Sequence, residues 1–186
     1  MKKTIILCFM LIILLCSCVH IKKIDYTFNS TSLNKTNQDG NEKILNEIYY
    51  SSINLYSIED YDKYITNLNN LSNSSYESIK NADYITCEDL ERETKFQKNI
   101  LKTLKNLKFS RNLFNTDESY ENAKKYKDVS IPNLIKARIN YFEILSADIE
   151  NLSIMTLTSL SQIENATLPL LSADAEKARA IFLDNF

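Results

Sequence analysis

The chain has 186 residues, with 22 Lys and Arg against 24 Asp and Glu, which leaves a formal net charge of −2. Nucleic-acid binding normally needs a clustered basic face, so this balance gives no electrostatic case for such a partner. With one glycine and two prolines, the chain lacks the residues that tight turns and phosphate-binding loops require, which argues against an all-β fold. His20 is the single histidine, and its position near the N-terminus excludes histidine-based triads and zinc sites from the body of the chain. The composition therefore predicts no enzyme, no metal and no cofactor.

The first seventeen residues have the pattern of an export signal. Lys2 and Lys3 give a positive start, and residues 4–15 form a run that is apolar apart from its first residue. Such a run, if helical, rises about 18 Å, which is too short for a hydrocarbon core of about 30 Å. A retained anchor helix is the alternative, but an extension of the run soon meets His20 and further charged residues. We therefore predict a cleaved signal peptide over residues 1–17.

The end of this signal carries the sequence Leu15, Cys16, Ser17, Cys18. It resembles the lipobox of bacterial lipoproteins, in which an aliphatic residue lies three positions before a cysteine and a small residue lies one position before it. In that family the cysteine thiol takes a diacylglyceryl group, and signal peptidase II cuts just before it. The resemblance implies that Cys18 is acylated and anchors the mature chain in a membrane. Cys16 is a poor acceptor, because Leu15 would then occupy the small-residue position.

The mature chain keeps one cysteine that is not acylated, Cys87, so no disulfide framework is expected in the exported protein. A helix start can make a thiol reactive, but because no histidine can pair with Cys87 we interpret it as a small buried or half-buried residue. Its role stays open. Residues 19–40 are polar and aperiodic, which predicts a flexible tether with a reach on the order of 25 Å, so that residues 18–40 form the lipidated cysteine and its tether.

From residue 41 the apolar residues recur with the 3.6-residue period of amphipathic helices. Ser57 and Thr86 have the side chains and the following acidic residues that favour helix starts. The expected elements are a helix over 41–56, a helix from Ser57 that weakens at the Asn- and Ser-rich stretch 69–75, a helix from Thr86, a turn at 112–116 and a short helix from Asp117.

The strongest apolar stripe follows Ser130 and Pro132, which fit a helix start, and it runs to Leu168 before Pro169. Over residues 152–160 of this stripe, apolar side chains occur on nearly every side of the helix. We expect other helices to surround this part, and self-association through spare apolar surface is the alternative.

A closing amphipathic helix is expected from Ser172. Together, these elements predict an all-α fold for residues 41–186, a helical bundle of about five helices packed nearly antiparallel.

One surface feature suggests a binding site. Lys95, Lys98, Lys102 and Lys105, continued by Lys108, are spaced so that they share one face of one helix. The ordinary interpretation is a solvated face, and the sharper one is contact with an acidic glycan or another anionic ligand.

The lipobox, the polar tether and a Gly-poor, Asn- and Lys-rich helical domain together resemble the small surface lipoproteins of spirochaetes. That resemblance implies an anchor in the outer membrane, a domain that faces outward, and binding of a host protein or an acidic glycan without catalysis. A periplasm-facing structural or assembly lipoprotein is an alternative, as is an exclusion lipoprotein encoded by a plasmid or phage. The identity of the ligand, the side of the membrane and the oligomeric state stay open.

Overall fold

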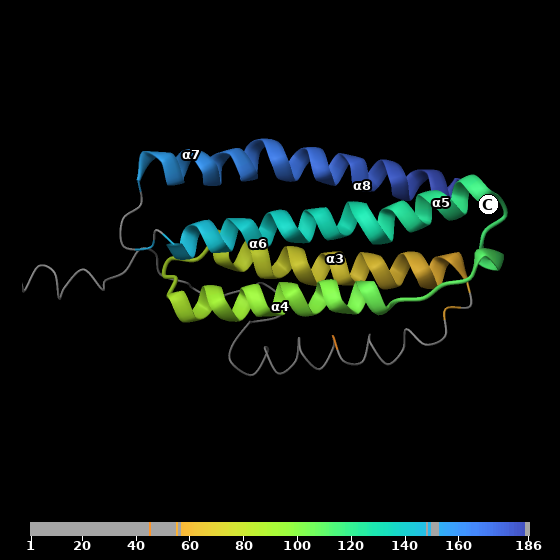
Figure 1. Cartoon of the computed structure of the whole chain (residues 1–186), viewed down its shortest axis with the longest axis horizontal. Helices are drawn as coiled ribbons and strands as arrows, with labels where there is room; N and C mark the ends of the chain where they lie inside the picture. Colours follow the sequence, from red (N-terminus) through yellow and green to blue (C-terminus); the bar gives the residue numbers. More distant parts are fainter. Residues whose placement is uncertain (1–44, 46–54, 56, 148, 150–152, 185–186) are drawn as a thin grey trace, which may run out of the picture.

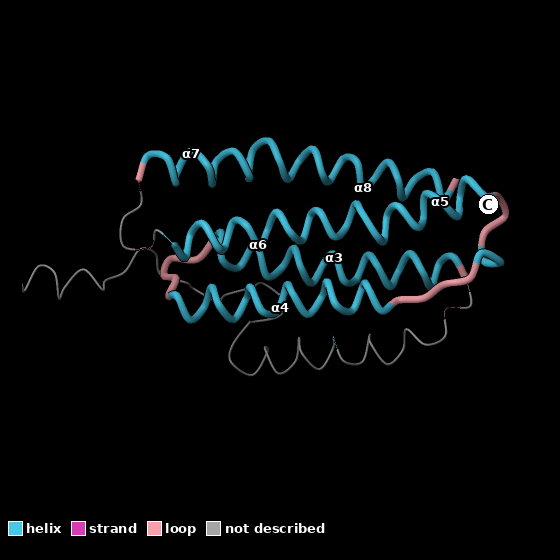
Figure 2. Tube along the Cα trace, viewed as in Figure 1, coloured by secondary structure: helices cyan, strands magenta, loops and turns pink. Residues whose placement is uncertain are grey.

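The computed structural model describes Leu45, Leu55, residues 57–147, Ile149 and residues 153–184 (Figure 1). Within these residues the secondary structure is helical, as predicted, and long helical segments run alongside one another (Figures 1 and 2). The expected signal peptide, Cys18, the tether and all but two residues of the expected helix over 41–56 lie outside the described residues.

Four long helical segments account for most of the described residues. The first two are single helices, whereas the other two each join α-helices through one π-helical turn. In chain order they are α3 (Ile58–Lys80); α4 (Cys87–Asn106); α5 (Asp117–Lys125) with η2 (Tyr126–Ser130) and α6 (Ile131–Ala147); and α7 (Ile154–Gln162) with η3 (Ile163–Thr167) and α8 (Leu168–Leu183). A short 3-10 turn, η1 (Arg111–Leu113), overlaps the start of the predicted turn at 112–116.

The helix starts follow from local capping. The Ser57 hydroxyl accepts a hydrogen bond from the backbone N–H of Asp60 at 3.1 Å, which starts α3. At α4 the Thr86 hydroxyl accepts from the N–H of Asp89 at 3.1 Å, while the Asp89 carboxylate accepts from the N–H of Thr86 at 3.1 Å. These reciprocal bonds satisfy N–H groups that lack a partner within the helix, so the predicted starts at Ser57 and Thr86 are confirmed.

The expected weakness of the helix at residues 69–75 is wrong, because α3 continues without a break to Lys80. Asn and Ser weaken a helix when their side chains bond to the backbone nearby. Here Ser72 and Ser75 are buried, and their hydroxyls donate instead to side chains of α4. Tertiary partners therefore remove the competition that the local sequence suggests.

The predicted boundaries of the long fifth helix are also wrong. No break occurs at Ser130, and the chain instead leaves the helix after Ala147 and starts a new one after Ser153. This second segment then passes through Pro169, and the separate helix expected from Ser172 is part of it.

Both prolines lie two residues after a π turn. The N–H of Ile131 bonds to the carbonyl of Tyr126, and the N–H of Leu168 bonds to the carbonyl of Ile163, five residues back in each case. A proline within an α-helix removes one hydrogen bond and clashes with the carbonyl four residues earlier. The wider π turn changes the hydrogen-bond register just before the proline. Pro169 therefore lies inside a continuous helix rather than at its end.

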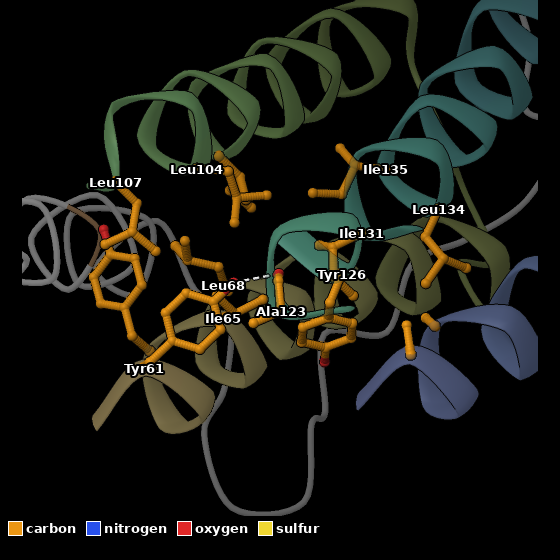
Figure 3. Close-up of a cluster of buried hydrophobic side chains, with 14 of the residues drawn as sticks. Tyr61, Ile65, Leu68, Leu104, Leu107, Ala123, Tyr126, Ile131, Leu134 and Ile135 are labelled. Atoms are coloured by element: carbon orange, nitrogen blue, oxygen red, sulfur yellow. Dashed lines mark hydrogen bonds between the residues drawn. The ribbon is translucent and has the colours of Figure 1, made fainter. Parts of the chain in front are cut away.

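Buried apolar side chains form two clusters along the segments. The larger one joins α3, α4, α5, η2, α6 and α8, and its members include Tyr61, Ile65, Leu68, Ile100, Leu104, Ala123, Tyr126, Ile131, Ile135 and Phe182 (Figure 3). The Tyr61 hydroxyl donates to the carbonyl of Ala123 at 2.5 Å, the bond drawn as a dashed line in Figure 3. The smaller cluster joins the end of α3 to α6, α7 and η3 through Tyr76, Ile79, Tyr141, Phe142, Leu145, Leu160 and Ile163.

The expectation that helices surround residues 152–160 is wrong for the described part of that range. Leu160 is buried, but Ile154 and Met155 are 84% and 81% exposed, and Leu157 is 52% exposed. The physical reason is position, because α7 lies at the edge of the molecule and packs mainly on α6 (Figure 1). Among the described helices, none is both long and apolar enough to cross a membrane.

Candidate functional site

The lysine row predicted from the sequence lies along the exposed side of α4. Lys95, Lys98, Lys102 and Lys105 are all exposed, as is Lys108 just after the helix. The opposite side of α4 packs on α3 and α6 through buried residues such as Ile100 and Leu104. The predicted periodicity is thus present, and the ammonium groups have access to solvent.

A groove of about 330 Å³ runs beside this row, between α4 and α6. Its walls combine one apolar side chain with charged and neutral polar groups. The lining residues are Leu90, Glu91, Thr94, Lys95, Lys98 and Asn99 from α4 with Glu143 and Ser146 from α6. The structure therefore brings Lys95 and Lys98 into a concave site, while Lys102 and Lys105 lie outside its lining.

One ion pair crosses the groove. The Lys98 Nζ lies 3.2 Å from the Glu143 Oε1, and both side chains are more than half exposed. Exposed pairs of this kind contribute roughly 0–1 kcal/mol, so a ligand displaces them at little cost. Lys95, Lys102 and Lys105 form no ion pair with any described residue. The row therefore presents ammonium groups that no neighbouring carboxylate of the described chain neutralises.

Behind this surface lies a buried polar network that links α3, α4 and α6 and that was not predicted from the sequence. Arg138 of α6 is 5% exposed. Its Nη1 donates to the Ser72 Oγ at 2.7 Å and to the Asn69 Oδ1 at 3.1 Å, and its Nη2 donates to the Asn73 Oδ1 at 3.0 Å. Within the described part of the chain no carboxylate pairs with this guanidinium. Burial lowers the pKa of Arg138 to about 10, against smaller opposing effects of Tyr76 and Glu77.

Gln97 extends the network to α4. Its side chain is fully buried, and its Oε1 accepts from the Ser72 hydroxyl at 2.6 Å. Its Nε2 donates to the Ser72 carbonyl at 2.8 Å and to the Ser75 Oγ at 3.1 Å. Ser75 in turn donates to the Glu93 carboxylate at 2.8 Å. Buried polar groups are costly unless hydrogen bonds satisfy them, so this network fixes how the three helices align.

A signal for this network exists in the sequence. Gln97 falls on the apolar stripe of its helix, and Asn69, Ser72 and Ser75 recur every three residues along one side of α3. A polar residue within an apolar stripe needs a buried partner. The sequence does not indicate that Arg138 belongs to this network, because no local pattern shows that α3 packs on α6.

The other predicted positions have simpler outcomes. Cys18 lies outside the described residues. Cys87 is a free, exposed thiol at the first residue of α4, so the interpretation made from the sequence, a buried or half-buried cysteine, is wrong. In the part of the chain that the structure describes, no three His, Cys, Asp or Glu side chains come together in a way that suits a metal ion.

Comparisons with known proteins add no relative. No protein-family model, no curated protein and no solved structure matches the chain. The candidate site therefore rests on its own geometry.

Proposed function

We propose that this chain is a lipid-anchored protein of the cell envelope that holds a helical-bundle domain outside the outer membrane as a binding module. The lysine row of α4, together with the adjoining groove, is its contact surface for an acidic ligand, such as an acidic glycan or an acidic patch on a host protein. The proposal assigns no catalytic step to the chain. Acylation of Cys18 supplies the anchor, as the resemblance to the lipobox implies.

The observation that carries the binding role is the pairing state of the lysines. Lys95, Lys102 and Lys105 are exposed and form no ion pair with the described residues, although the chain as a whole is slightly acidic. From Lys95 to Lys105 an α-helical rise spans about 15 Å, which suits a ligand with repeated negative charges rather than a single small anion. A row of like charges raises the local potential and concentrates such a ligand.

The groove adds shape to this electrostatic contact. Lys95 and Lys98 belong both to the row and to the groove, so one ligand can contact the row while one of its groups enters the groove. Thr94, Asn99 and Ser146 line the same groove with neutral groups that both donate and accept hydrogen bonds. A hydroxyl-bearing sugar unit with an acidic substituent has the matching chemistry.

Binding is tested with a variant in which Lys95, Lys98, Lys102 and Lys105 become Gln, which removes four charges and keeps the helix propensity. The matched control replaces four exposed lysines away from the groove, namely Lys63, Lys124, Lys125 and Lys177. We expect the α4 variant to lose at least ten-fold in affinity for an immobilised sulfated or uronic-acid glycan, and the control to lose less than three-fold. Equal losses in both variants would show that net charge, and not the α4 row, governs binding.

The anchor and the outward orientation need a separate test. Cys18→Ala should abolish incorporation of labelled fatty acid and leave an uncleaved precursor, and normal processing of that variant would refute the lipoprotein assignment. Protease added to intact cells should degrade the domain. Protection until the outer membrane is opened would favour the periplasm-facing structural lipoprotein, and a gene position within a plasmid or phage exclusion region would favour the third alternative.

A further inference from the structure

The outward side of α7 exposes apolar side chains at a density seen in no other described helix. Ile154, Met155 and Leu157 are 84%, 81% and 52% exposed, and Leu170 on the continuation of the same segment is 71% exposed. Ile154, Met155 and Leu157 together form the α7 face. Large exposed apolar side chains in a cluster mark a surface that another molecule covers.

This side of the molecule also lacks charge. From Ser153 to Ala173 the only ionisable side chain is Glu164, which is half-buried. Burial is the main cause that raises the pKa of the Tyr141 hydroxyl, and the nearby Glu164 adds to this effect. The row on α4, in contrast, carries five lysines. A partner that covers the α7 face therefore removes few charges from water, which is the most expensive part of forming an interface.

Several polar side chains of α7 and of the turn after it already have hydrogen-bond partners within their own helix. The Thr158 hydroxyl donates to the Ile154 carbonyl at 2.8 Å, and the Ser159 hydroxyl donates to the Met155 carbonyl at 2.9 Å. One helical turn later, the Asn165 amide donates to the Ser161 carbonyl at 3.0 Å. Groups that are satisfied in this way lose no hydrogen bond when water leaves, so the helix is suited to burial against another surface.

We propose that a second copy of this chain covers the α7 face, so that the two α7 helices lie side by side and parallel around a two-fold axis that runs along them. In such an interface the same patch lies on both partners, and each residue near the axis meets its own counterpart. A charged face would repel itself in this arrangement, whereas the uncharged α7 face is complementary to itself. The exposed Ile154 and Leu157 of one copy would pack on the same residues of the other.

A lipid surface suits this end of the molecule less well. From Ser153 to Ala173 the chain has no lysine or arginine. Helices that lie on a membrane surface normally attract anionic headgroups through such residues. A second copy needs no such charge, because it offers an uncharged apolar face of its own.

The expected strength of the pair is modest. A helix from Ile154 to Thr167 is about 20 Å long, and a contact of that length is at the low end of interface sizes, below about 1,200 Å² in total. Two chains anchored in one membrane share a thin layer, however, and this raises their effective concentration. The pairing is therefore expected on the membrane, and it requires neither the lysine row nor a ligand.

Disulfide trapping in membranes from cells that make the full chain tests the proposal. Cys87→Ser removes the described free thiol, and Ser161→Cys then places one on the exposed side of α7, two turns after Ile154. The control places the cysteine at Asn67, an exposed position of α3. A disulfide forms only when two Cα atoms come within about 7 Å. We expect at least five-fold more covalent dimer on mild oxidation from the Ser161 position than from the Asn67 position.

The α7 face itself is tested in the same background. Changing Ile154, Met155 and Leu157 together to Gln should lower the dimer yield from the Ser161 position to the level of the Asn67 control. Helical circular dichroism and the melting temperature of this variant should match the parent, which separates loss of pairing from loss of folding. Equal dimer yields at the two positions would overturn the proposal. Protection of the Ser161 position from a water-soluble maleimide without dimer formation would also overturn it, in favour of lipid or another protein.

Discussion

The middle of α3 and the start of α7 differ in which side chains they bury. Around Ser72 the structure buries hydroxyl, amide and guanidinium groups, whereas at Ile154 it exposes large apolar side chains to water. In the first region three helices meet, so Ser72, Gln97 and both Nη groups of Arg138 find partners on other segments, and of this guanidinium only the Nε is left without one among the described residues. In the second, α7 has α6 on one side and no described helix on the other. In these two regions the number of neighbouring helices, more than the polarity of the residue, determines which side chains are buried.

The two regions also differ in what they contribute to the molecule. The network around Arg138 fixes the alignment of α3, α4 and α6, and so it positions the groove that lies between α4 and α6. The α7 face contributes nothing to that alignment and stays available to a partner. One region serves the site from inside the molecule, and the other offers a second surface at its edge.

The largest loss of stability is expected from substitution of Arg138 in the first of these regions. Arg138→Ala removes three hydrogen bonds and leaves Ser72, Asn69 and Asn73 without their donor, so we expect a loss of about 3 kcal/mol in the free energy of unfolding. Arg138→Met fills most of the volume and also removes a charge that is costly to bury. It should therefore lose less than half as much in urea denaturation. An equal loss in both variants would mean that the hydrogen bonds, and not packing, dominate this site.

A substitution on the inward side of the α7–α8 segment should lower stability nearly as much. Ile163 is 6% exposed and packs in the smaller cluster with Tyr141 and Phe142. Ile163→Ala removes buried methyl groups and leaves a cavity, so we expect a loss of about 2–4 kcal/mol in thermal or urea unfolding. A loss below about 1 kcal/mol would indicate that the segment is bound loosely along both of its sides.

A second buried polar group, in the larger cluster, should make the protein sensitive to alkali. Burial, followed by the nearby Asp128, raises the pKa of Tyr61 far above its ordinary value of 10.0. The unfolded chain therefore loses this proton near pH 10 while the folded chain keeps it, and stability present below pH 10 falls as the pH rises above it. Tyr61→Phe should cost about 1–1.5 kcal/mol at neutral pH through the lost bond to Ala123, and it should show a shallower loss between pH 10 and 11. Identical slopes would place the alkaline sensitivity at other tyrosines.

Features that depend on neighbours in sequence were predictable. The caps at Ser57 and Thr86 involve residues three positions away, so the sequence contains both partners of each bond. The exposure of the lysine row follows in the same way from helical spacing. Each of these features is complete within one turn or one face of a single helix.

Features that depend on distant partners were not predictable. Asn69 and Ser72 weaken an isolated helix, and only in the folded chain do they accept hydrogen bonds from Arg138, more than sixty residues later. The groove beside Lys98 likewise needs Glu143 from α6. Pro169 signals a helix end by itself, and only the π turn before it explains why the helix continues. An apolar run such as the one around Ile154 gives the same pattern whether a neighbouring helix or a partner molecule covers it.

A substitution at the N-terminal cap of α4, on the surface of the protein, should cause a loss of stability of intermediate size. Burial acts to raise the pKa of Asp89, but hydrogen bonds from Thr86 and Arg92 outweigh it and hold that pKa below its ordinary value of 3.8. The ionised carboxylate therefore stabilises the folded state above about pH 4, and this contribution is lost as the pH falls through the lowered pKa. Asp89→Asn should cost about 1 kcal/mol at pH 7 and almost nothing at pH 2 in urea denaturation. A loss that does not change with pH would assign the effect to packing.

The smallest effect is expected at the α7 face, and it completes the comparison with Ile163. Ile154→Ala removes the same atoms as Ile163→Ala from the same helical segment, but Ile154 is 84% exposed. At dilutions where the chain is monomeric, the free energy of unfolding should change by less than about 0.5 kcal/mol. If pairing through α7 occurs, the same variant should lose stability relative to the parent as protein concentration rises, because only the parent gains the free energy of association. A loss of about 2 kcal/mol or more at every concentration would mean that Ile154 packs within its own chain, and the difference between the two sides of this helix would then disappear.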